Sequence, residues 1–179
     1  MAPIRSPSPV KPICAITFAP EIHLETVIAE LEPLLGKEED RSPIYPFIHT
    51  TYYKDEMGEH LQKVFLSFCE LQLPDQLVLW KIKTNKLEEK WTFQNKRKVN
   101  LDPGYLTSAK LVMASTKDFA HRIFLGQGIY GDLQLQFRHG KWHPHPWTFP
   151  DYQTELAFAF FEKVRNRFVE QERTQRHAV

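Results

Sequence analysis

Residues 129–141 have the sequence IYGDLQLQFRHGK, and this stretch decides the fold class. Leu133, Leu135 and Phe137 alternate with polar residues, a period of two that is typical of a strand with one face on a core. His139-Gly140 then supplies the residues of a tight chain reversal. The stretch therefore predicts a strand that ends in a β-hairpin, and with it an antiparallel sheet.

Strand features extend through the centre of the chain, where Gly and Pro residues supply the turns. A further short apolar run near the N-terminus also predicts a strand. The predicted strands are 13–18, 99–101, 110–115, 122–125 and 129–137. Residues 44–53 are rich in aromatic residues and threonine and predict another strand, after a charged loop at 37–42.

Helical periodicity flanks these strands. Residues 21–35 carry apolar side chains at helical spacing before Gly36, and residues 151–173 carry an apolar stripe opposite charged residues. Residues 59–69 also show a helical period, whereas residues 75–87 fit either a helix or a strand. Together these segments predict an α+β fold, a single layered domain with a largely antiparallel sheet flanked by helices.

Length and composition agree with one globular unit. The chain has 179 residues and a formal net charge of +1, so no strong general field attracts nucleic acid or an anionic membrane. We expect a flexible proline-rich tail at residues 1–12 and a single domain at 13–179. No run of about 18 apolar residues is present, so we expect no membrane partner. Cys14 and Cys69 lie in apolar stretches, which is typical of buried free thiols in a reducing compartment, so we expect a cytoplasmic location.

The first candidate site lies at residues 51–58, TYYKDEMG, where a predicted strand leads into a helix start. It brings Tyr53 and Glu56 into a short segment. The same residues also suit helix capping and packing at a sheet edge, because carboxylates favour helix N-termini.

The second candidate lies at residues 97–105, RKVNLDPGY. Pro103-Gly104 fits a type II turn. Strand alternation puts Lys98, Asn100 and Asp102 on one face, which predicts either a solvated sheet face or the wall of a polar pocket.

Three later segments complete the candidates. Residues 115–122, STKDFAHR, gather donors for a phosphate or a carboxylate, although a polar loop would explain them equally well. His139, His143 and His145 could chelate zinc, but Pro144 and Pro146 bracket the last of them, and no Cys lies near. Residues 147–152 precede the terminal helix, and Asp151 is predicted to cap it, although the aromatic residues beside Asp151 could also line a pocket.

In combination, these motifs resemble an uncharacterised bacterial family that is filed as a domain of unknown function. The motifs that carry the resemblance are YY with EMG at 52–58, R-VNLDPGY at 97–105, TKD with HR at 116–122, GIY at 128–130 and WTFPDY at 147–152. Some members of that family are labelled GTP-binding proteins. The chain has no G-x-x-x-x-G-K-[ST] loop and no G-x-G-x-x-G motif, so the sequence does not indicate a GTPase.

The leading hypothesis is a polar pocket for a small anionic ligand, such as a phosphorylated molecule or a nucleotide, with no specific cofactor indicated. The predicted catalytic residues are Glu56, Asp102 and His121. The predicted ligand-binding residues are Tyr53, Arg97, Asn100, Tyr105, Lys117, Arg122 and Tyr130.

Two alternatives stay open. The first is a non-enzymatic interaction domain for RNA or a protein, using aromatic and basic residues, although the near-zero net charge disfavours nucleic acid. The second is a zinc-dependent hydrolase built on the histidine segment.

Overall fold

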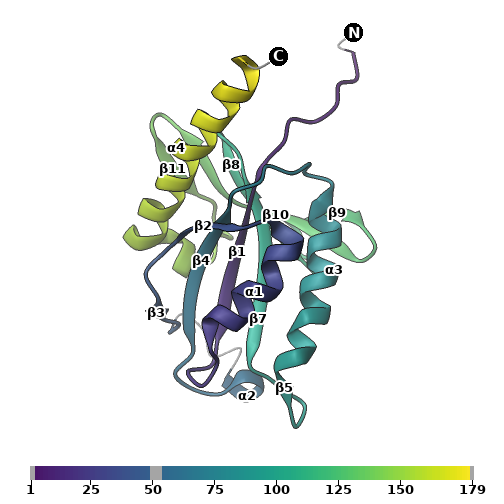
Figure 1. Cartoon of the computed structure of the whole chain (residues 1–179), viewed down its shortest axis with the longest axis vertical. Helices are drawn as coiled ribbons and strands as arrows, with labels where there is room; N and C mark the ends of the chain where they lie inside the picture. The colour runs from purple at the N-terminus through teal and green to yellow at the C-terminus, as the bar shows by residue number, and fades with distance from the viewer. Residues whose placement is uncertain (1–2, 49–53, 178–179) are drawn as a thin grey trace.

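The computed structural model describes residues 3–48 and 54–177 and contains a large antiparallel sheet with helices on both faces (Figure 1). Nine of the described strands form this sheet in the order β11-β10-β8-β7-β1-β4-β2, with β3 paired to β4 and β9 paired to β10. A separate two-stranded hairpin joins β5 and β6. The elements are β1 (Lys11–Phe18), α1 (Leu24–Leu35), β2 (Glu38–Arg41), β3 (Tyr45–Pro46), α2 (Lys54–Met57), β4 (Gln62–Phe68), α3 (Gln76–Glu88), β5 (Thr92–Phe93), β6 (Lys96–Arg97), β7 (Val99–Leu106), β8 (Lys110–Ser115), β9 (Ile123–Gly126), β10 (Ile129–Arg138), β11 (Lys141–Pro144) and α4 (Glu155–His177), with 3₁₀ turns at Glu89–Trp91 and Pro150–Gln153.

Two apolar cores lie on opposite faces of the sheet. Helices α1 and α3 cover one face and pack on side chains such as Cys14, Ile16 and Leu66. Helix α4 covers the other face, where Phe65 meets a row of its aromatic residues. The structure therefore confirms the predicted α+β class with a large antiparallel sheet.

The central strand β4 corrects the helix predicted at residues 59–69. Its residues from Lys63 to Phe68 are all buried, because α1 and α3 cover one side of the strand and α4 covers the other. A strand buried on both faces is apolar almost throughout, so its sequence loses the alternation that marks a one-sided strand.

Other segments differ from their predicted form in length or type. Strand β2 replaces the loop predicted at 37–42 and pairs with β4. Strand β3 is only a short remnant of the strand predicted at 44–53, of which residues 49–53 lie outside the described part. Residues 75–87, which fitted two structures, form helix α3. Strand β1 begins at Lys11, two residues before the predicted start.

Pro103 and Gly104 continue strand β7 and do not form the predicted turn. They pair with Cys14 and Ile13 of β1. The N–H of Leu101 points away from β1, and because N–H direction alternates along a strand, the nitrogen of Pro103 points away from β1 as well. Proline therefore costs this ladder no hydrogen bond, which is why it is tolerated inside the sheet.

A β-bulge in β10 separates Leu133 from Leu135, which were predicted to share one face. Leu133 pairs with Val112 and Leu135 with Leu111, so Gln134 is the additional residue. Leu133 consequently packs on the α1 and α3 side, whereas Leu135 packs on the α4 side. The predicted hairpin after β10 is present, with positive φ at His139 and Gly140.

None of the helices in the described part of the chain has both the length and the apolar composition that a membrane crossing requires.

Candidate functional site

A cleft of about 780 Å³ opens where strands β7 and β8 separate. Within the part of the chain that the structure describes, β8 pairs with β7 only along Gly104–Leu106. The close approach there depends on Gly104, since a Cβ on this residue would lie 2.4 Å from the Met113 sulfur. Residues 99–103 of β7 stay paired with β1 on one edge, but on the other edge they border the cleft and helix α3 and have no paired residue of β8.

Two charged side chains of α3 take the place of the missing strand at Leu101. The Nζ of Lys81 donates to the Leu101 carbonyl at 2.9 Å, and the Leu101 N–H donates to Glu88 Oε1 at 2.7 Å. Lys81 and Glu88 are seven residues apart and lie on the same face of the helix, together with the buried Thr84. Both backbone groups of Leu101 are therefore satisfied although the sheet has split.

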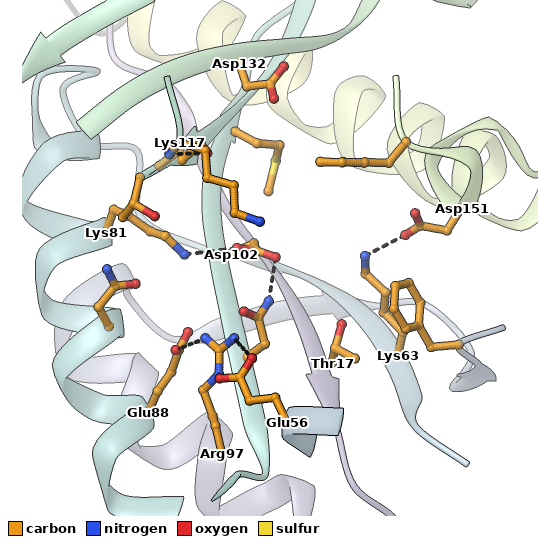
Figure 2. Close-up of a pocket in the computed structure, with 18 of the residues that line it drawn as sticks. Thr17, Glu56, Lys63, Lys81, Glu88, Arg97, Asp102, Lys117, Asp132 and Asp151 are labelled. Carbon is orange, nitrogen blue, oxygen red and sulfur yellow. Dashed lines mark hydrogen bonds and ion pairs between the residues drawn. The ribbon is translucent and has the colours of Figure 1, made fainter. Parts of the chain in front are cut away.

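Asp102 stands at the centre of the cleft (Figure 2). Its carboxylate accepts hydrogen bonds from Lys81 at 2.9 Å and from the Asn100 amide at 2.6 Å, and its side chain keeps 29% of its exposure. Burial alone would raise the pKa of Asp102, but attraction from Lys81 and Lys63 and the two hydrogen bonds outweigh burial and hold the pKa below its ordinary value. Asp102 is therefore ionised at neutral pH.

Arg97 closes the end of the cleft near α2. Its guanidinium pairs with Glu88 and, at 3.0 Å, with Glu56. Burial raises the pKa of Glu88, and the attraction of Lys81 and Arg97 offsets this effect only in part. Arg97 thus holds Glu88 in the position in which Glu88 also receives the Leu101 N–H.

The opposite wall contains a buried ion pair between Lys63 and Asp151, 2.5 Å apart and each about 95% buried. The ammonium of Lys63 lies 4.9 Å from the centre of the Phe47 ring and 5.0 Å from that of Tyr152. Burial, reinforced by the Asp151 charge, raises the pKa of Tyr152 well above its usual value. Asp151 is thus an ion-pair partner in a 3₁₀ turn, and the predicted cap of α4 is wrong: Thr154 accepts the hydrogen bond of Ala157 N–H at the helix start.

The loop after β8 brings Lys117 over the centre of the cleft. Figure 2 shows the Lys117 side chain extending toward Asp102. The loop is held by Arg122, whose guanidinium donates to Ser115 Oγ at 2.5 Å and to Asp132 at 2.7 Å. Arg122 and Asp132 are almost completely buried.

The structure brings most of the ten predicted site residues to this one cleft. Those that line it are Glu56, Arg97, Asn100, Asp102, Lys117 and Arg122. Tyr53 lies outside the described residues.

Three predicted residues lie outside the lining of the cleft. Tyr105 packs on the core covered by α1 and α3, and burial raises its pKa. Tyr130 packs beside Phe124, with ring centres 5.4 Å apart. His121 stacks on Trp147 at 5.1 Å, and its Nε2 lies 3.7 Å from Asp132.

Sequence reasoning missed six of the eleven charged residues that line the cleft. The missed residues are Lys63, Lys81, Glu88, Glu89, Asp132 and Asp151. A single cation in an otherwise apolar strand was a usable signal for Lys63. The seven-residue spacing of Lys81 and Glu88 becomes a signal only once the segment is known to be a helix.

The histidine segment does not assemble as a metal site. His143 Nε2 lies 3.1 Å from the Arg138 carbonyl oxygen, while His145 stacks on Trp147 with ring centres 4.9 Å apart. Across residues 3–48 and 54–177, no three His, Cys, Asp or Glu side chains converge as metal ligands would.

The RNA-binding alternative would use Trp91, Lys96, Arg97 and Lys98 together with Tyr52 and Tyr53, which lie outside the described residues. Three of the described four make contacts within the molecule. Arg97 pairs with carboxylates inside the cleft, Lys98 pairs with Glu21 at 3.0 Å, and Trp91 packs on the core.

Comparison with known proteins identifies the family. No curated protein and no solved structure matches the chain. One family pattern, described as a domain of unknown function, DUF4416, matches residues 8–168. This range contains every element of the sheet and all the residues that line the cleft. The chain therefore belongs to the DUF4416 family of domains of unknown function.

Proposed function

We propose that the cleft binds a small anionic ligand, of the class of phosphorylated molecules and nucleotides. The main support is that four ion pairs, each with at least one almost fully buried member, face this single cleft. The pairs are Lys63–Asp151, Lys81–Asp102, Arg97–Glu88 and Arg122–Asp132.

Stability alone is a poor reason to keep these pairs. Removing two charges from water costs several kcal/mol per ion, and apolar replacements of similar volume are often as stable or more stable. Groups with perturbed ionisation that gather in a cleft are more typical of binding and catalytic sites. A set of charges held ready around an open volume supports a ligand that exchanges hydrogen bonds with them.

The charges of the lining restrict what that ligand can be. Five cations and six carboxylates surround the cleft, so its lining has no net positive charge that would attract every anion. The cations are Lys63, Lys81, Arg97, Lys117 and Arg122, and the carboxylates are Glu56, Glu88, Glu89, Asp102, Asp132 and Asp151. In this proposal Lys117 and Lys81 hold the anionic group, while Asp102 and Asn100 receive and donate hydrogen bonds to hydroxyl groups of the same ligand.

The carboxylates of the cleft differ in how well they could act in a reaction. A carboxylate with a lowered pKa, like that of Asp102, is a weak base and serves better as a hydrogen-bond acceptor than as a general base. Catalytic roles for Glu56, Asp102 and His121 stay predictions. Glu56 and Asp102 have the advantage of lining the cleft.

A thermal-shift screen tests the proposal directly. The panel contains inorganic phosphate, pyrophosphate, sugar phosphates, nucleotides and small carboxylates, each with and without Mg²⁺. A ligand that binds only the folded state increases the free energy of unfolding and so raises the melting temperature. At a ligand concentration of 100 times Kd, the increase is about 2.7 kcal/mol. We expect one class of ligand in the panel to raise the melting temperature of the parent protein. The same ligands should not raise the melting temperature of Lys117→Met.

Lys110→Met is the matched control, because Lys110 is an exposed lysine of β8 outside the cleft lining. A shift that survives in Lys117→Met, or that Lys110→Met also abolishes, would contradict the assignment of the anion to this cleft.

A protein-binding role is the second candidate, and one observation favours it. Strand β9 exposes three consecutive apolar residues, Ile123, Phe124 and Leu125, by 45–72% of their surface. Absence of a shift across the whole panel, together with association that depends on these three residues, would favour this candidate over ligand binding.

A further inference from the structure

Two chain segments form opposite walls of the cleft. One is residues 115–122, called here the Lys117 loop, which contributes Lys117 and Phe119 to the lining. The other is residues 145–152, called here the Asp151 segment, which contributes Phe149 and Asp151. They are separated in sequence by strands β9 to β11, and a chain of buried polar side chains connects them.

The buried side chain of Arg122 contacts three other residues of the Lys117 loop. Its guanidinium donates to Ser115 Oγ at 2.5 Å and to the Lys117 carbonyl at 3.2 Å, and it lies 4.5 Å from the centre of the Phe119 ring. Ser115 Oγ also receives the Lys117 N–H at 3.1 Å. One buried cation therefore fixes the backbone of Lys117 and supports the Phe119 ring.

Asp132 and Gln134 carry the connection to the opposite wall. Asp132 receives Arg122 Nε at 2.7 Å through one oxygen and the Gln134 amide at 2.7 Å through the other. Gln134 in turn receives the Phe149 N–H at 3.0 Å through its side chain, and its backbone carbonyl receives the Thr148 hydroxyl. Figure 2 places Asp132 above the cleft, between Lys117 and Asp151.

The β-bulge of β10 makes this chain of contacts feasible. Gln134 is the additional residue of the bulge, and it is fully buried, as is Asp132 at 2% exposure. Bulges redirect single side chains and often occur beside functional sites. A second contact joins the same two segments, because His121 of the Lys117 loop stacks on Trp147 of the Asp151 segment.

Buried polar chains of this kind behave as units. The side chains of Arg122 and Asp132 are both about 97% buried, so loss of one partner leaves a neighbouring charge or amide buried without a hydrogen bond. The neighbouring group then moves to regain a partner, and this movement weakens its own next hydrogen bond. The two segments should therefore be ordered together and loosened together.

We propose that Arg122, Asp132 and Gln134 are positioning residues that couple the two walls of the cleft, so that the placement of Lys117 depends on the placement of the Asp151 segment and the reverse. The inference rests on the proposed function only in taking this cleft as the binding site. The coupling itself is a property of the unliganded chain.

Hydrogen exchange of the full chain, followed by mass spectrometry without ligand, tests the coupling. Gln134→Met removes the acceptor of the Phe149 N–H and the donor to Asp132, and among the described residues Gln134 has no hydrogen bond to the Lys117 loop. Ser115→Ala removes the acceptor that the Lys117 N–H and the Arg122 guanidinium share, and among the described residues Ser115 has no hydrogen bond to the Asp151 segment. We expect each variant to speed exchange in both segments, by about fivefold in the remote one, the lower range of measured couplings between sites.

Ser42→Ala is the matched control, since Ser42 is a buried hydroxyl that receives the Phe65 N–H on strand β4, outside the cleft lining. It should change neither segment. Exchange of the β1 amides, measured in the same samples, corrects for any loss of global stability. If each variant loosens only the segment that it touches, the coupling is wrong. Because no ligand is added, this outcome is independent of whether the ligand screen succeeds.

Discussion

Replacing Lys81 by methionine removes the ammonium group that binds the Leu101 carbonyl and Asp102, at the point where β8 no longer pairs with β7. Methionine keeps the apolar length of the side chain, so the change is mainly electrostatic. In the variant, the Leu101 carbonyl and the Asp102 carboxylate both lose the Lys81 ammonium at 2.9 Å. Asp102 keeps Asn100 as a donor.

The expected loss of stability follows from the burial of the pair. Removing one partner of a buried ion pair costs about 3–5 kcal/mol. Lys81 is 6% exposed, but Asp102 keeps 29% of its exposure, so water recovers part of this cost. We therefore expect about 3 kcal/mol, which for a chain of this length lowers the melting temperature by about 6–12 °C.

Urea unfolding, with and without Asp102→Leu in the same chain, measures the effect. The double variant Lys81→Met/Asp102→Leu should recover at least half of the loss, because no unpaired carboxylate remains. Lys83→Met, an exposed lysine of the same helix, should stay within about 0.5 kcal/mol of the parent protein. A loss below about 1 kcal/mol for Lys81→Met, or a double variant less stable than Lys81→Met alone, would refute the role given to this pair.

Three further outcomes are expected. The folded-state pKa of Asp102 is lowered, so its stabilising effect is present above its ordinary pKa and is lost as pH falls through the folded value. The stability difference between the parent and Asp102→Asn should therefore shrink from pH 6 to pH 3 in urea titrations, and a constant difference would contradict this. Gly104→Ala places a Cβ 2.4 Å from the Met113 sulfur and closer than contact distance to a backbone carbonyl, so we expect a loss of about 2 kcal/mol that Met113→Ala does not fully restore. Burial raises the pKa of both Cys14 and Cys69, but only Cys14 is fully buried, so a thiol reagent at pH 8 should modify Cys69 slowly and Cys14 only after unfolding; two fast thiols would contradict the packing of β1.

The fold class could be predicted from elements that have one face on the core and the other exposed to solvent. The hairpin at His139-Gly140 and helix α1 with its end at Gly36 carry period and turn signals that depend on a few neighbouring residues. Strand β4 carries no such signal, because it is buried on both faces. Helix α3 was ambiguous because its buried face includes Lys81, Thr84 and Glu88, which weaken the apolar stripe.

The candidate site was predictable where several polar residues lie close in sequence. Asn100 with Asp102, and Lys117 with Arg122, come from two dense segments that meet at the cleft. Their partners come from strands and helices far along the chain: Lys63 meets Asp151 across 88 residues, and Lys81 meets Asp102 across 21. Such pairs depend on strand order, which no local pattern contains. Tyr105 faces the opposite core because strand alternation continues through Pro103, where a turn was expected.

The replacement of a strand by Lys81 and Glu88 also affects how the protein behaves at high concentration. An exposed strand edge with free N–H and C=O groups can pair with an edge of another molecule, and this is a common route to aggregation. At Leu101 both groups are already occupied by side chains of the same molecule. The two charged residues thus protect an open edge against intermolecular strand addition, and variants that lose them should be harder to keep in solution for reasons separate from their folding stability.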